Sequence, residues 1–106
     1  MEIKELLEFI KKEDQRLAHK YDFNSEKERV FARMIKLSEE VGEFGDEVLR
    51  FFSLQRNDKE EKDGLGEEFA DVVITAMLLA ESMNVDIENS LERKIEKINK
   101  RYEEKE

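Results

Sequence analysis

The chain has 106 residues, a length that suits one compact domain and leaves no room for two. It contains no cysteine, so disulfides, thiolate metal sites and thiol nucleophiles are excluded. Its net charge of −9, from 28 acidic and 19 basic residues, repels phosphate backbones and argues against a nucleic acid polymer as the main partner.

The first half of the chain predicts two helices, because apolar residues recur there at intervals of three or four. The first helix is expected over residues 2–20, and the pattern breaks at residues 21–24. Ser25, with Glu28 three residues later, makes a capping box that starts a second helix, which is expected to end near residue 54. Residues 55–66 are polar, dense in charge and closed by two glycines, so we expect a loop there.

The second half predicts two further helices, over about residues 67–83 and 87–102, joined by a turn at residues 84–86. The charged tail, residues 103–106, is expected to fray. The last helix carries one apolar face, made by Ile87, Leu91, Ile95, Ile98 and Tyr102.

Four amphipathic helices with short connections predict an all-α fold, a four-helix bundle that residues 1–106 form as a single domain. No apolar run approaches the about 20 residues that a membrane helix needs, and the first residues do not resemble a targeting leader. We therefore expect a cytoplasmic protein without a membrane partner.

The third predicted helix contains an aspartate in apolar surroundings. From residue 69 to residue 80 only Asp71 and Thr75 are polar, and the apolar residues fall all round the helix, which predicts burial in a core or an interface. An unpaired carboxylate in such a place is costly, so Asp71 requires a partner. Glu68 reaches toward the same side from one turn earlier, and a cation between the two carboxylates would satisfy both. The alternative partner is a basic side chain of the fourth helix, Lys94 or Arg101.

The second predicted helix supplies a matching pair of carboxylates, Glu40 and Glu43. On a helix of about 3.6 residues per turn, Glu40 borders the apolar face, whereas Glu39 points well away from it. A Glu-x-x-Glu pair is common on solvated helix surfaces. Taken alone, this pair is more simply interpreted as two solvent-exposed residues without a function.

Two such pairs on neighbouring helices indicate a metal site. If the second and third helices pack antiparallel, four carboxylates converge at one level: Glu40, Glu43, Glu68 and Asp71. Oxygen ligands without His or Cys suit Mg²⁺, with Mn²⁺ as the alternative, rather than zinc. Mg²⁺ usually completes its shell with water and substrate phosphates, so we expect phosphoanhydride chemistry at this site.

At these residues the sequence resembles the MazG-like all-alpha nucleotide pyrophosphohydrolases, whose hallmark is a Glu-Glu-x-x-Glu helix followed, after a variable loop, by a Glu-x-x-Asp helix. Residues 39–43 and 68–71 match the two motifs in that order, and the likeness extends over residues 31–102. The resemblance implies Mg²⁺-dependent hydrolysis of a nucleoside triphosphate to monophosphate and pyrophosphate, which clears surplus or non-standard nucleotides. It also implies a catalytic set in which Glu39 is a further ligand or orients the attacking water, and in which the metal is held by Glu40, Glu43, Glu68 and Asp71.

Members of this family also tend to have a basic C-terminal helix of the form Lys-x-x-Lys-x-Asn-x-Arg-Tyr near the phosphates. The resemblance therefore implies substrate contacts by the matching residues: Lys94, Lys97, Asn99, Arg101 and Tyr102. The helical wheel agrees for Lys94 and Arg101, which lie beside the apolar face and can project toward the bundle interior. The alternative is that these residues form a solvated basic edge, whose positive charge stabilises the C-terminal end of the helix by interacting with the helix dipole.

Two other functions fit parts of this pattern. A phosphoribosyl-ATP pyrophosphohydrolase shares the fold and the acidic motifs, but such enzymes typically carry a Tyr-His pair soon after the aspartate, and residues 72–76 contain neither. A non-catalytic helical dimerisation module would explain the apolar third helix but not Asp71. The apolar third helix and the small core of such a short chain predict a homodimer or homotetramer.

Overall fold

The computed structural model describes the backbone of residues 1–53 and 59–103, and the side chains of residues 1–52 and 63–103. The described backbone forms four helices and no strand: α1 (Ile3–Lys20), α2 (Glu26–Ser53), α3 (Lys59–Ser82) and α4 (Ile87–Glu103). The predicted all-α fold class is thus confirmed. Over this part of the chain, no helix has the length and apolar character needed to traverse a bilayer.

Local hydrogen bonds explain several of the helix ends. Ser25 Oγ accepts a hydrogen bond from the backbone N–H of Glu28 at 3.1 Å, so the predicted cap is present at the start of α2. At the end of α3, Asn84 has a left-handed φ of 58°, a conformation that asparagine tolerates better than most residues. Asp86 Oδ1 then caps α4 by accepting a hydrogen bond from the N–H of Asn89 at 3.0 Å. These ends agree closely with the predicted boundaries.

The predicted loop over residues 55–66 is wrong from residue 59 onward, because α3 begins at Lys59 instead of near residue 67. Residues 59–62 are lysines and glutamates, which favour helix and offset the cost of about 1 kcal/mol for each of Gly64 and Gly66. Neither glycine has another atom within 4 Å of the place that a Cβ would take, so close packing does not require them. Residues 55–58 of the predicted loop and 104–106 of the expected tail lie outside the described residues.

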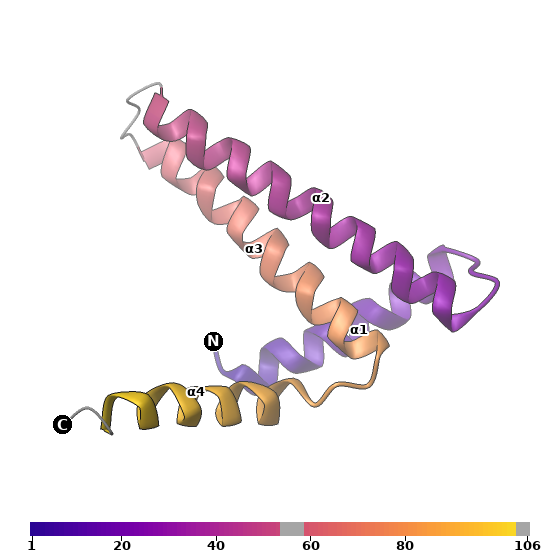
Figure 1. Ribbon diagram of the computed structural model, residues 1–106. Helices are drawn as coiled ribbons and strands as arrows, with labels where there is room; N and C mark the ends of the chain where they lie inside the picture. The colour runs from indigo at the N-terminus through magenta and orange to yellow at the C-terminus, as the bar shows by residue number, and fades with distance from the viewer. Residues whose placement is uncertain (54–58, 104–106) are drawn as a thin grey trace.

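The long helices α2 and α3 lie side by side and run in opposite directions (Figure 1). The rings of Phe44 on α2 and Phe69 on α3 meet edge to face across this contact, with their centroids 6.3 Å apart. α1 crosses α3 near the C-terminal end of α3, and α4 leaves from the same corner of the molecule (Figure 1). The antiparallel packing brings the two acidic motifs to the same level, as the sequence predicts.

The hydrophobic core lies where α1 crosses α3 and α4 begins. Ile10 of α1 is completely buried there, in one cluster with Met77 and Leu78 of α3 and Ile87 of α4. Partly buried apolar side chains surround this cluster: Leu6, Leu7, Leu17, Val73, Ile74 and Ala80. The core therefore holds one corner of the molecule together and leaves the far ends of α2 and α3 to pack against each other.

A buried arginine ties three helices together at this corner. Arg33 of α2 forms an ion pair with Asp14 of α1 and donates a hydrogen bond from Nη1 to the backbone carbonyl of Leu78 in α3, at 2.9 Å. Arg29 reaches the same Asp14 carboxylate at 3.4 Å. The Arg33 side chain is only 8% exposed, so loss of Asp14 would leave a buried charge without its ion pair, which destabilises a folded protein. This network therefore fixes α2, and the acidic motif on it, relative to α3.

The position of α4 differs from the one expected in a closed bundle. Ile87 is buried, but residues 88–103 are all exposed. The exposed residues include four of the five that form its predicted apolar face: Leu91, Ile95, Ile98 and Tyr102. Among the described helices α4 meets mainly α3, and only where α4 begins, so nothing in the described part of a single chain covers this face.

Candidate metal centre

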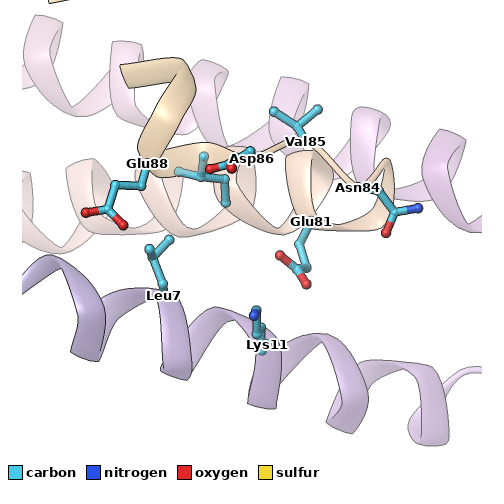
Figure 2. A pocket seen from close by; sticks show the side chains of 8 residues that line it. Leu7, Lys11, Glu81, Asn84, Val85, Asp86 and Glu88 are labelled. Carbon is cyan, nitrogen blue, oxygen red and sulfur yellow. The ribbon is translucent and has the colours of Figure 1, made fainter. Parts of the chain in front are cut away.

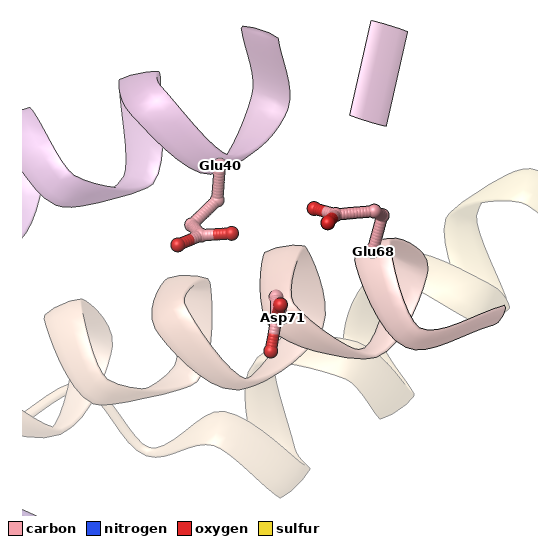
Figure 3. A group of neighbouring side chains, drawn as sticks. All are labelled: Glu40, Glu68 and Asp71. Atoms are coloured by element: carbon pink, nitrogen blue, oxygen red, sulfur yellow. The ribbon is translucent and has the colours of Figure 1, made fainter. Parts of the chain in front are cut away.

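Three carboxylates converge between α2 and α3. One carboxylate oxygen from each of Glu40, Glu68 and Asp71 lies within 4.8 Å of the others. Figure 3 shows Glu40 reaching from α2 toward α3 and Glu68 reaching from α3 into the same gap, while Asp71 lies on α3 one turn beyond Glu68. The spacing of three residues puts the two α3 side chains on one face of that helix. The antiparallel packing of the helices then places Glu40 opposite them.

Two of these side chains have a carboxylate oxygen that is shielded from water and accepts no hydrogen bond. Glu40 is 7% exposed, and Glu68 is half-buried. Glu40 Oε2 and Glu68 Oε2 are both buried and have no hydrogen-bond partner. An orphaned carboxylate oxygen is costly in a protein interior, and two of them in one group indicate a site that suits a cation.

The surroundings of Glu68 oppose its ionisation. Burial raises the pKa of the Glu68 carboxyl, and the negative charges of Glu43, Asp71, Glu40 and Glu47 raise this pKa further. A divalent cation would act in the opposite direction, since it stabilises the ionised form of each carboxylate around it. The electrostatics of the group therefore also favour a bound cation.

The donor set fits Mg²⁺ or Mn²⁺, because all the donors are carboxylate oxygens. Two oxygens on opposite sides of one Mg²⁺ are about 4.2 Å apart, with bonds of about 2.1 Å. The observed span of 4.8 Å is only slightly wider. Among the side chains that the structure describes, no ion pair joins Glu68 or Asp71 to a basic residue, so the alternative partner for Asp71, a lysine or arginine of α4, is not observed.

The burial expected for α3 is observed only in its C-terminal part. Thr75, Met77 and Leu78 are buried, whereas Phe69 and Asp71 are exposed, so the expectation of an all-round buried helix is wrong for the single chain. The reason is that α1 covers only the C-terminal part of α3 (Figure 1). Burial therefore does not explain the aspartate at position 71, and its placement among the other carboxylates follows from the pairing of α2 with α3.

Glu43 and Glu39 occupy different positions relative to this group. Glu43 lies near enough for its charge to act on Glu68, although it is not one of the three residues whose oxygens fall within 4.8 Å. The Glu39 side chain is 59% exposed, in agreement with its predicted position away from the apolar face of the helix. Glu47, one turn beyond Glu43, also acts on Glu68, and the sequence argument does not select it.

Lys36, which the sequence does not mark as a site residue, lies beside the three carboxylates. Lys36 Nζ is 3.2 Å from Glu40 Oε1 and 3.9 Å from Glu39 Oε2. The hydrogen bond to Glu40, followed by the charge of Glu40, raises the pKa of the Lys36 ammonium. The spacing of four residues between Lys36 and Glu40 is visible in the sequence, but such pairs are common on helix surfaces and do not point to a site.

The five candidate phosphate-binding residues of α4 are not at the acidic group in the single chain. Lys94 and Lys97 line one shallow hollow on α4, and Asn99 lines another. Arg101 and Tyr102 are exposed near the end of this helix. Because α4 diverges from α2 and α3 (Figure 1), its basic edge faces water, and its contact with phosphates stays a prediction.

A separate hollow of about 360 Å³ lies between α1 and the turn that joins α3 to α4 (Figure 2). Its lining combines Lys11 of α1 with three acidic residues: Glu81, Asp86 and Glu88. Asp86 already caps α4 through its carboxylate. None of the predicted site residues lines this hollow, so it is not the candidate site.

The sequence matches the family model of the MazG nucleotide pyrophosphohydrolase domain over residues 30–105, which include both acidic motifs and α4. The chain therefore belongs to the MazG nucleotide pyrophosphohydrolase family, hydrolases that act on the phosphoanhydride bonds of nucleotides and typically depend on a divalent metal ion. The resemblance and the class of enzyme predicted from the sequence are both confirmed. The comparison with curated proteins gave no match, and neither did the comparison with solved structures.

Proposed function

We propose that this protein is a Mg²⁺-dependent nucleoside triphosphate pyrophosphohydrolase, which releases a monophosphate and pyrophosphate and so removes unwanted nucleotides from the cellular pool. The observation that carries the proposal is the group of Glu40, Glu68 and Asp71, which offers three carboxylate oxygens within 4.8 Å of one another. Two buried oxygens of this group have no partner in the protein, which supports a bound cation.

In the proposed site the ion is held by the four acidic residues of the two motifs: Glu40, Glu43, Glu68 and Asp71. An ion held by these four carboxylates would supply charge neutralisation for the pyrophosphate leaving group and would help to ionise the attacking water. Glu39 lies one residue from this set with an exposed carboxylate, so its proposed role is to orient that water. The α2–α3 pair carries every proposed ligand, which favours a rigid site over one built on loops.

A nucleotide panel tests the proposed reaction. With Mg²⁺ present, at least one nucleoside triphosphate should yield pyrophosphate and monophosphate in equal amounts, because one water cleaves the bond between the α- and β-phosphates. Removing the ion with a chelator should stop the reaction, and Mg²⁺ or Mn²⁺ should restore it. Release of single phosphates from the triphosphates would contradict the proposal, and turnover of phosphoribosyl-ATP alone would establish the alternative enzyme instead.

We further propose that the protein assembles as a homodimer or homotetramer. Large apolar side chains of α2 are exposed in the single chain, including Phe31, Ile35 and Leu49, and so is the apolar face of α4. Monomeric proteins rarely expose large apolar surfaces, so exposed apolar faces on two helices favour contact with another copy. A second copy would cover these faces, and the contact proposed between the basic edge of α4 and the phosphates requires either that copy or another position of α4.

Light scattering tests the proposed assembly. The wild type should have at least twice the mass of one 12.7 kDa chain, and Ile95→Glu should shift the mass toward that of a monomer by placing a charge on the apolar face of α4. Asn89→Glu adds the same charge to the opposite, polar side of the helix and should leave the mass unchanged. A wild type that is strictly monomeric would contradict the proposal.

A further inference from the structure

Lys36 stands at the solvent side of the proposed metal centre. Its ammonium is paired with Glu40 Oε1 at 3.2 Å, while Oε2 of the same carboxylate is buried without a partner. The Lys36 side chain is 58% exposed, and the Glu40 side chain only 9%. The two oxygens of the Glu40 carboxylate therefore differ. Oε2 is buried and free to bind a cation, whereas Oε1 is paired with the exposed Lys36 ammonium.

The negative charge around the site means that a basic group is needed to bind the substrate's phosphates. Five carboxylates lie close enough for their charges to interact at Glu68, and a single divalent ion offsets only part of their negative charge. They are Glu68 itself, Glu40, Glu43, Glu47 and Asp71. The phosphate chain of a nucleotide adds further negative charge, which this field would repel unless a basic group met it. Substrate binding therefore needs positive charge on the open side of the acidic group.

Few basic side chains are placed to supply that charge. Among the described ion pairs, Lys36 is the basic partner of a residue in the group of three. Arg50 is paired with Glu47 at 3.5 Å and lies about three turns beyond Glu40 along α2, and the basic edge of α4 lies on a diverging helix (Figure 1). Lysine also suits the task, because its ammonium sits on a long flexible stem and binds phosphate as a compact charge.

Helix stability does not explain the pair of Lys36 and Glu40. An ion pair four residues apart adds only slightly to the stability of a helix, and a lysine that precedes its glutamate is in the less favourable order. A cation bound to Glu40 would compete for the same carboxylate and weaken its bond to the ammonium. The lysine would then be free to meet a ligand on the outer face.

We propose that Lys36 is a substrate-binding residue, whose ammonium pairs with Glu40 in the metal-free protein and contacts phosphate oxygens of the nucleotide once the ion is bound. This inference rests on the proposed function and adds a residue that lies outside both acidic motifs. Its distinguishing consequence is that loss of the lysine charge affects the ion and the phosphates in opposite directions.

Calorimetric titration of Lys36→Gln tests this assignment with two probes, Mg²⁺ alone and inorganic pyrophosphate at saturating Mg²⁺. Mg²⁺ should bind at least as tightly as to the wild type, because a positive charge has been removed beside its ligands. Pyrophosphate should bind about tenfold more weakly, since a charge-assisted contact is lost. Lys36→Arg should restore most of the pyrophosphate affinity.

Lys27→Gln is the matched control, since Lys27 is an exposed lysine of the same helix whose ammonium lies over the ring of Phe31. Both affinities of this control should equal those of the wild type. Unchanged pyrophosphate binding in Lys36→Gln would overturn the assignment, and so would weaker binding of Mg²⁺, which would mean that Lys36 acts only by positioning Glu40. A wild type that binds neither probe would instead defeat the proposed function itself.

Discussion

Replacement of Asp71 by asparagine is expected to lower the rate of pyrophosphate release by at least about a hundredfold, as loss of a charged metal ligand does. The side chain lies on α3 with its carboxylate in the group formed with Glu40 and Glu68. Asparagine keeps the shape but removes the charge that the ion requires. Because Asp71 is exposed in the single chain, the substitution should leave helical content and unfolding temperature almost unchanged.

Asp63→Asn provides the matched control for this prediction. Asp63 is an exposed aspartate on the same helix, about two turns earlier, and it belongs to neither acidic motif. The control should keep the turnover of the wild type, measured under the same Mg²⁺ and nucleotide concentrations. Equal turnover in Asp71→Asn and Asp63→Asn would remove Asp71 from the proposed metal site.

The sequence could predict the acidic group because two local patterns combine there. In each motif a spacing of three residues puts two carboxylates on one face of a helix, and the antiparallel pairing of α2 and α3 brings the two faces together. The burial of Glu40, now 7% exposed, also follows from its place beside the apolar stripe of α2. These features depend on helix periodicity, which a single sequence displays directly.

The burial that the sequence predicts for Asp71 is not observed in the single chain. An apolar residue on every side of a helix predicts covered surfaces, but it does not say whether the same chain or a second copy covers them. In the single chain α1 reaches only the C-terminal part of α3, and Phe69 and Asp71 stay exposed. Asp71 stands out in the sequence because it interrupts an apolar helix, and that pattern implies its burial only if another surface covers this part of α3.

Two further differences between prediction and structure have causes that local sequence patterns do not reveal. The start of α3 at Lys59 depends on helix-forming lysines and glutamates outweighing two glycines, and a rule that takes glycine as a breaker misses this balance. The direction of α4 depends on which surfaces remain free after α1 has packed at the corner, a property of the whole fold. Lys36 was missed for a similar reason, since its spacing from Glu40 is that of an ordinary surface pair.

If carboxylates of α2 and α3 share one divalent ion, Mg²⁺ should stabilise the folded protein. An ion that binds only the folded state, at a hundred times its dissociation constant, raises the free energy of unfolding by about 2.7 kcal/mol. For a domain of this size that corresponds to an increase of about 10 °C or more in Tm. Glu68→Gln should lose most of the increase, because Glu68 supplies one of the buried oxygens without a partner.

Thermal unfolding of metal-free protein over a series of Mg²⁺ concentrations, at constant ionic strength, measures this directly. Glu67→Gln is the control, since Glu67 is an exposed neighbour outside both motifs. We expect Tm to rise with Mg²⁺ in the wild type and in Glu67→Gln, and to rise far less in Glu68→Gln. A wild-type Tm that is the same at every Mg²⁺ concentration would contradict the shared ion, and with it the proposed site.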